Sequence, residues 1–256
     1  MPAPENRLKS ALARGDTRVG CWAGFAASYP TEVLAEAGFD WLVIDAEHAP
    51  NDLGTISAQL AVLRGAETQA VVRLPMGETW AIKQVLDAGA QTLLIPMVES
   101  AAQATGLVRA MRYPPEGVRG SGAALARASR FSGIADYIRT ANAQTCLLVQ
   151  VETRTGLDAL DEILAVEGVD GVFIGPSDLA ADMGHLGDAS VPEVQEAIRD
   201  ALGRIAAAGR APGILALDPE AASRYRDWGA RFLAVGIDVV LLAEAARALA
   251  ARWRNG

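Results

Sequence analysis

Short apolar runs alternate along the chain with segments that have the spacing of amphipathic helices. Eight runs are rich in valine, leucine and isoleucine and have the length of buried strands: 19–25, 40–45, 70–74, 92–97, 146–152, 171–175, 212–217 and 232–237. Between them lie helical patterns such as "TEVLAEAG" and "WAIKQVLDAG", several of which end in the glycine that often closes a helix. Eight alternating units in 256 residues predict an α/β fold, a (β/α)8 TIM barrel, with a doubly wound open sheet as the alternative. No linker interrupts residues 1–256, so we expect a single barrel domain.

Polar residues interrupt these apolar runs near their C-terminal ends. The stretch "LLVQVETRTG" (147–156) places Gln150 and Glu152 two positions apart, on one face of a strand, with Val151 on the other face. Corresponding positions in or after the other runs carry Trp22, Asp45, Glu47, His48, Arg73, Ser177 and Asp178. Because the active sites of (β/α)8 barrels lie at the C-terminal ends of the strands, this pattern predicts that these side chains gather at one rim.

Glu152 and Asp178 form the central pair of this rim. A carboxylate buried without a partner costs several kcal/mol, so each needs a cation, a proton or several hydrogen-bond donors. Two carboxylates from neighbouring strands suit a hard divalent ion such as Mg²⁺ or Mn²⁺, which takes one or two protein carboxylates and leaves its other positions to water and substrate. The alternative is a structural ion pair between Glu152 and Arg154 or Arg73.

His48 and Arg73 are the candidates for proton transfer and charge stabilisation. His48 follows a strand and lies close in sequence to Asp45 and Glu47, and an adjacent carboxylate can orient an imidazole and raise its basicity. A loop histidine satisfied by backbone groups is the alternative. Arg73 lies inside an apolar run, where arginine is rare without an anionic partner. It either holds Glu152 or Glu47 structurally or stabilises an oxyanion that develops on a substrate.

A helix start follows the sixth strand in "IGPSDLAADMG" (174–184). Ser177 or Asp178 is expected to cap this helix, and the same helix start can present backbone N–H groups to a carboxylate. A metal, an arginine, a base and this helix start would together let a 2-oxo acid chelate the metal and form an enolate.

Two segments extend beyond a minimal barrel. Residues 112–134 form an excursion rich in glycine and arginine, and long loops of this kind are often functional or interfacial. The segment "VVLLAEAARALAARWR" (239–254) predicts a closing helix with apolar residues spread widely around it. Such a helix needs a partner, in its own barrel or in a neighbouring subunit.

Charge and composition narrow the classes of function. The formal net charge of −8 argues against a nucleic-acid surface, and no apolar run approaches the roughly 20 residues of a membrane span. Cys21 and Cys146 fall in expected strands without metal-ligand spacing, so we expect buried free thiols in a reducing compartment, the cytoplasm. Lys9 precedes the barrel and Lys83 lies on the third expected helix, which argues against an enzyme that forms a Schiff base.

Five stretches together resemble the HpcH/HpaI family of class II pyruvate aldolases. They are "FDWLVIDAEHAPND", "QTLLIPMVESAAQA", "RYPPEGVRGSGAALARASRF", "LLVQVETRTG" and "VEGVDGVFIGPSDLAADMG". The likeness runs in order over nearly the whole chain.

The resemblance implies a role for each residue of the rim. Glu152 and Asp178 would ligate a divalent metal ion, Mg²⁺, Mn²⁺ or Co²⁺. His48 would be the general base and Arg73 the group that stabilises the enolate. The implied substrate-binding residues are Gln150, Gly175, Ser177, Asp178, Trp22 and Leu215.

The resemblance also implies an assembly. Asp87 would support His48 from a neighbouring subunit, in a hexamer built as a trimer of dimers that exchange the C-terminal helix. The helical pattern alone would leave Asp87 as a solvated surface residue.

The expected reaction is reversible cleavage of a 4-hydroxy-2-oxo acid to an aldehyde and pyruvate, or a related 2-oxo acid such as hydroxypyruvate. The alternatives are a citrate-lyase-type enzyme acting on a CoA thioester, another enolate-forming carbon–carbon lyase or decarboxylase, and an inert metal- or anion-binding protein. Leu215 would belong to the apolar wall that faces the aldehyde. Ser177 stands where alanine is expected in the closest relatives, and "RLPMGETW" departs from them as well, so the pattern does not identify the aldehyde.

Overall fold

Eight parallel strands close into a barrel in the computed structural model, which describes residues 1–254. The strands pair in chain order and β8 pairs with β1, so the (β/α)8 prediction is confirmed and the open sheet is excluded. Their bounds are β1 (Arg18–Ala23), β2 (Trp41–Asp45), β3 (Gln69–Arg73), β4 (Thr92–Ile95), β5 (Cys146–Val151), β6 (Val169–Ile174), β7 (Ala211–Leu215) and β8 (Phe232–Ile237). The strand ends lie within two residues of those that the apolar runs predict.

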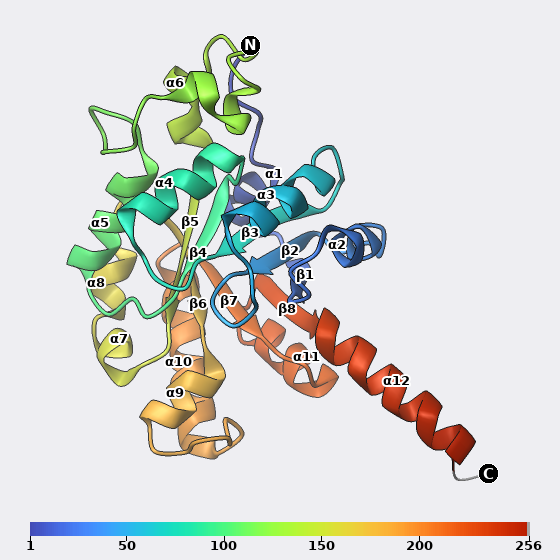
Figure 1. The fold of residues 1–256 in the computed structure, drawn as a ribbon. Helices are drawn as coiled ribbons and strands as arrows, with labels where there is room; N and C mark the ends of the chain where they lie inside the picture. The colour runs from blue at the N-terminus through green and yellow to red at the C-terminus, as the bar shows by residue number, and fades with distance from the viewer. Residues whose placement is uncertain (255–256) are drawn as a thin grey trace.

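Helices surround the barrel (Figure 1). The α-helices are α1 (Arg7–Ala13), α2 (Ser28–Ala35), α3 (Leu53–Val62), α4 (Thr79–Ala88), α5 (Ala101–Met111), α6 (Tyr137–Thr140), α7 (Arg154–Asp158), α8 (Leu160–Leu164), α9 (Pro176–Asp182), α10 (Pro192–Ala207), α11 (Pro219–Asp227) and α12 (Asp238–Arg254). Three short 3-10 turns cover Ala123–Leu125, Arg127–Ser129 and Ala141–Gln144.

Local signals set the helix bounds. Asp52 and Thr55 form a capping box at the start of α3, and the Asp218 side chain accepts a hydrogen bond from the backbone N–H of Ala221 at the start of α11. Gly89 ends α4 with a φ of 114°, a left-handed conformation that glycine adopts without steric cost.

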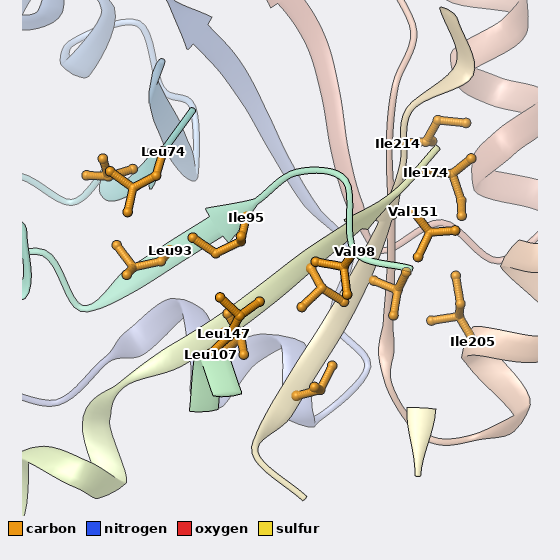
Figure 2. Packing of buried hydrophobic residues seen from close by; sticks show 14 of the residues in the cluster. Leu74, Leu93, Ile95, Val98, Leu107, Leu147, Val151, Ile174, Ile205 and Ile214 are labelled. Atoms are coloured by element: carbon orange, nitrogen blue, oxygen red, sulfur yellow. The ribbon is translucent and has the colours of Figure 1, made fainter. Parts of the chain in front are cut away.

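Two apolar layers lie on the two sides of the strands. The outer layer packs between the strands and the helices, and Figure 2 shows part of it, with Val151 and Ile174 from the strands and Ile205 from α10. Val151 therefore turns toward the helices, as the alternation in β5 predicts.

The inner layer fills the barrel from its N-terminal end. Leu8 and Leu12 of α1 belong to this cluster, and inside the barrel Trp41 stacks on Phe232 with ring centroids 3.8 Å apart. Because the N-terminal half is packed with apolar side chains, the space inside the barrel that polar groups can reach lies at the C-terminal ends of the strands.

The 112–134 excursion is fixed to the barrel by a buried arginine. The guanidinium of Arg119 lies over the rings of Tyr113 and Tyr137, and its Nη2 donates to Oδ1 of Asp87 at 2.7 Å. The side chain of Arg119 is only 1% exposed. The excursion is thereby joined to α4, on which Asp87 lies.

The closing helix α12 leaves the barrel rather than covering it (Figure 1, lower right). Its start contacts β1 and β8, where buried Asp238 accepts a hydrogen bond from the backbone N–H of Gly24 at 2.8 Å. Four large apolar side chains farther along the helix are 50–79% exposed: Leu241, Leu242, Leu249 and Trp253. Among residues 1–254, no helix is long and apolar enough to cross a membrane.

Candidate active site

A cavity of about 550 Å³ opens at the C-terminal ends of the strands. Its lining residues are Trp22, Gly24, Asp45, His48, Ala49, Pro50, Arg73, Gln150, Phe173, Gly175, Pro176, Ser177, Asp178, Leu215, Ile237, Val239 and Val240. Every residue expected in the site is among them except Glu47, Glu152 and Asp87. Most of the side chains that the rim pattern groups together therefore line one cavity.

Glu152 follows β5 directly and is buried, with 2% of its surface exposed. Its Oε1 accepts a hydrogen bond from the backbone N–H of Met97 at 2.9 Å, and its Oε2 accepts one from Nε2 of Gln150 at 2.5 Å. Burial raises the pKa of Glu152, and the negative charges of Asp178 and Glu47 raise it further, against the effect of the two hydrogen bonds.

The structural ion pair considered for Glu152 does not form. Arg154 lies 3.7 Å from Glu193, and Arg73 pairs with Asp45 and Glu47. Within residues 1–254, the ion pairs include neither Glu152 nor Asp178. Among the described residues, the buried carboxylate therefore has hydrogen-bond donors but no lysine or arginine partner.

Gly175 and Gln150 bring the Glu152 carboxylate to the cavity. A Cβ at position 175 would collide with Oε2 of Glu152, so the close approach of β6 to this carboxylate requires glycine. Oε1 of Gln150 is buried and accepts no hydrogen bond from the described residues. An unsatisfied acceptor on a cavity wall is available to a donor group of a ligand.

Asp178 lies in the first turn of α9 and is exposed to the cavity. The expectation that Ser177 or Asp178 caps this helix is wrong, because the N-cap is Gly175 and no side chain makes the capping bond. Pro176 occupies the first helical turn, which places the next two side chains inside the helix rather than at its cap. The Asp178 carboxylate therefore stays free of a capping bond.

Arg73 ends β3 and is oriented by two acidic residues. Its Nε and Nη2 donate to the two oxygens of Asp45 at 2.8 and 2.7 Å, a bidentate pair. Its Nη1 lies 2.7 Å from Oε2 of Glu47. The geometry of this contact is that of an ion pair and not of a hydrogen bond. The guanidinium also lies 5.4 Å from the ring centroid of Trp22. Arg73 thus pairs with Glu47, as one of the two sequence interpretations expected, and its main partner is Asp45. It also lines the cavity.

His48 lies at the mouth of the cavity. Its side chain is 66% exposed, and Nε2 lies 3.7 Å from Oε2 of Glu47. Burial raises the pKa of Glu47, and Asp45 and Asp178 raise it further, while Arg73 and His48 oppose the change. His48, Glu47 and Arg73 therefore form one electrostatic group at the ends of β2 and β3.

Asp87 lies outside this cavity in the single chain. It lies near the end of α4, where it pairs with Arg119, and 36% of its side chain is exposed. The sequence pattern left it on the surface without a partner, and Arg119 is the partner that the fold supplies. Its expected role beside a neighbouring subunit's His48 stays a prediction.

The model of the HpcH/HpaI aldolase/citrate lyase family matches residues 18–245 of the chain. The chain belongs to this family. All eight strands and the complete cavity rim lie in the matched range.

Named members of the family are similar over the full length. The hydroxypyruvate/pyruvate aldolase of Roseovarius nubinhibens is 76% identical over 255 residues, covering 100% of this chain and 99% of the relative. The 4-hydroxy-2-oxo-heptane-1,7-dioate aldolase of Shigella flexneri is 54% identical, covering 98% and 94%. The crystal structure of an HpcH/HpaI aldolase/citrate lyase family protein from Burkholderia cenocepacia J2315 has a TM-score of 0.94 and 41% identity, covering 97% of this chain and 99% of that one.

The donor set of this HpcH/HpaI family member fits a hard divalent ion. Within residues 1–254, no group of three or more His, Cys, Asp or Glu side chains is arranged to hold a metal ion. The available set is a pair, Glu152 and Asp178, whose charges affect each other and are not neutralised by arginine. Such a pair suits an ion that keeps positions for water and substrate.

Several cavity residues of this family member escape a reading of the sequence. Phe173, Ile237, Val239 and Val240 line the cavity but look like ordinary core or helix residues in the chain. The backbone N–H of Met97, which binds Glu152, leaves no side-chain signal at all. Of these residues, only Phe173 could have been found from the sequence. It lies two positions before Gly175, so the two residues share one face of the strand.

Proposed function

We propose that this protein is an aldolase that cleaves a 4-hydroxy-2-oxo acid to an aldehyde and a 2-oxo acid, pyruvate or hydroxypyruvate, and catalyses the reverse addition. The observation that carries the proposal is the buried Glu152 carboxylate, which no lysine or arginine of the described residues neutralises, beside a cavity that Asp178 lines. The 76% identity to an enzyme named hydroxypyruvate/pyruvate aldolase supports the same reaction class and the same pair of 2-oxo acids.

Glu152 and Asp178 are the residues that would hold the divalent ion, Mg²⁺, Mn²⁺ or Co²⁺. When bound, the ion would supply Lewis-acid stabilisation of the negative charge that develops on the keto oxygen of the 2-oxo acid. The 2-oxo acid would lie against Gln150, Gly175 and Ser177, where the unsatisfied Oε1 of Gln150 can accept a hydrogen bond, for example from the hydroxyl of hydroxypyruvate.

Arg73 would orient the 2-oxo acid and stabilise its enolate. An arginine has five N–H donors, and the bonds to Asp45 use those of Nε and one on Nη2. The remaining N–H groups can reach an oxygen of the substrate on the cavity side. Asp45 and Glu47 fix the plane of the guanidinium, so little reorganisation is needed when the charge develops.

His48 would move the proton at C3 of the 2-oxo acid. It lines the cavity, its imidazole is accessible, and its Nε2 lies 3.7 Å from Oε2 of Glu47, which can orient the ring. In the direction of cleavage, a base removes the proton of the C4 hydroxyl as the C3–C4 bond breaks, and C3 of the resulting enolate then receives a proton. Lys9 and Lys83 do not line the cavity, so a Schiff base has no amine there.

The working form would be an oligomer, a hexamer built as a trimer of dimers that exchange α12. The exposed leucines and Trp253 of α12 support burial against another copy of the chain. The side chain of Asp87 is 36% exposed beside Arg119, so a neighbouring subunit can reach it. A cytoplasmic location agrees with the buried, unpaired thiols of Cys21 and Cys146.

The proposal is tested by incubating the purified protein with pyruvate or hydroxypyruvate and a panel of aldehydes after chelation, and after return of Mg²⁺, Mn²⁺ or Co²⁺. We expect the aldol product only when a divalent ion is returned. Full activity in excess chelator would exclude the metal role. Absence of any product, together with no exchange of the C3 protons of pyruvate into D2O, would exclude the aldolase proposal.

A further inference from the structure

The cavity has two chemically different sides. One side is polar and carries Gln150, Ser177 and Asp178, with Gly175 beside the buried Glu152. The other side is apolar and is built from β7, β8 and the start of α12: Leu215, Ile237, Val239 and Val240. If the 2-oxo acid occupies the polar side, the apolar side is left for the second substrate, the aldehyde.

The apolar side offers no positive charge. Among the described residues that line the cavity, Arg73 is the only lysine or arginine. Its charge already faces two carboxylates, since Asp45 takes a bidentate pair of hydrogen bonds and Glu47 lies 2.7 Å from Nη1. Arg73 therefore has N–H groups left for one substrate oxygen, but no uncompensated charge for a second anion.

Counted as formal charges, with every carboxyl group ionised and His48 neutral, the loaded site is negative. Arg73 is the one arginine among the described lining residues, and four carboxylates lie in or against the cavity: Asp45, Glu47, Glu152 and Asp178. A divalent ion adds two positive charges, and the carboxylate of the 2-oxo acid removes one of them. A second carboxylate on the aldehyde would be desolvated against Leu215 and Val240 without a partner, in a site whose net charge repels it.

We propose, resting on the proposed aldolase function, that the aldehyde substrate of this protein is uncharged. In the addition, C3 of the 2-oxo acid loses a proton and bonds to the aldehyde carbon, whose oxygen gains a proton, so no other reactant is needed. The proposal separates this chain from relatives named 4-hydroxy-2-oxo-heptane-1,7-dioate aldolase, because retro-aldol cleavage of that dioate yields an aldehyde with a carboxylate.

The direct test compares 4-oxobutanoate with its methyl ester, which lacks the negative charge and carries one more methyl group, each added to pyruvate by the metal-loaded enzyme. We expect kcat/KM to be about tenfold or more higher for the ester, as a carboxylate without a partner implies. The ratio should shrink as ionic strength rises. A higher kcat/KM for 4-oxobutanoate would overturn the inference and leave the aldolase function intact, whereas no addition to either aldehyde would count against the aldolase function itself.

A charge introduced on the apolar wall gives the second test. Leu215→Arg places a cation on the lining, and Leu217→Arg places the same charge on an exposed residue outside it. We expect Leu215→Arg to shift the ratio of kcat/KM values toward 4-oxobutanoate by about tenfold, and Leu217→Arg to leave it near that of the wild type. Val240→Lys serves the same purpose from α12 if Leu215→Arg does not fold. Equal ratios for the lining variant and the wild type would show that this wall does not face the aldehyde.

Discussion

The backbone N–H of Met97 donates a 2.9 Å hydrogen bond to Oε1 of Glu152, although Met97 has a φ of 55°. A non-glycine residue in this left-handed region carries a steric cost of about 1–2 kcal/mol. The turn after β4 therefore holds a strained conformation in which its N–H points at the carboxylate proposed to bind the metal.

Replacing Met97 tests whether this turn positions Glu152. Met97→Val should lower the free energy of unfolding by about 1–2 kcal/mol and weaken divalent-ion binding, because a β-branched residue resists the left-handed conformation. Met97→Gly, which accepts it, should keep both properties close to those of the wild type. Thermal unfolding and calorimetric titration with Mn²⁺ measure the two effects, and Met76→Val is the control in an exposed loop. Equal metal affinity in the valine and glycine variants would exclude the positioning role.

Glu152→Gln should raise the Tm of the metal-free protein at neutral pH and abolish the stabilisation that a divalent ion gives. Burial raises the pKa of Glu152, so the folded state holds its proton to higher pH than the unfolded chain does. The free energy of unfolding therefore falls as pH rises above 4.5, the ordinary pKa of glutamate, because the folded state resists ionisation of Glu152. The neutral amide of glutamine does not ionise, so the variant avoids this loss of stability. The advantage of the variant should vanish in acid below that value, which scanning calorimetry across pH can follow. A variant less stable than the wild type at every pH would contradict this account.

His48→Ala should lower kcat by about 10²–10⁴-fold, the usual contribution of a general base, and leave metal affinity unchanged. His185→Ala is the matched control, because His185 lies on the surface beside Glu193 and outside the cavity. Turnover should be measured together with exchange of the C3 protons of pyruvate in D2O. Normal exchange in His48→Ala would remove this residue from proton transfer.

Arg73→Lys should lower kcat by about 10²–10³-fold, because a point charge cannot replace the planar group that two carboxylates orient. Lysine can pair with Asp45 or Glu47 but cannot keep the bidentate geometry and also donate into the cavity. We expect the rate of C3-proton exchange to fall in parallel with kcat. An exchange rate equal to that of the wild type would leave Arg73 with only its structural pairing.

Mixed subunits test the proposed partnership of Asp87 with a neighbouring His48. Asp87→Asn should slow the reaction without releasing the metal, since Asp87 lies outside its own cavity. If one site combines residues of two chains, dissociating and reassembling Asp87→Asn with His48→Ala should create some intact sites and restore part of the activity. Activity that stays at the level of the separate variants after proven subunit exchange would refute the shared site.

The alternation of apolar and helical segments determined the barrel, because a strand buried on both faces needs a continuous apolar run and the helices between need one apolar face. The same pattern predicted the rim, since polar residues at the ends of parallel strands meet at one end of a barrel. Of the residues that the pattern places there, seven line one cavity: Trp22, Asp45, His48, Arg73, Gln150, Ser177 and Asp178. Gly175 and Leu215, which the family resemblance implied, line it as well.

Only the tertiary structure decided how these groups are paired. The sequence left Arg73 between several carboxylates, and the choice of Asp45 follows from the register that places Asp45 opposite Arg73 on the neighbouring strand. The sequence was compatible with either a metal ion or an arginine as the partner of Glu152. The fold excludes the arginine, because Arg73 pairs with Asp45 and Arg154 lies beside Glu193. Strand spacing fixes which residues reach one rim, but hydrogen-bond direction and burial depend on three-dimensional neighbours, which a linear pattern does not encode.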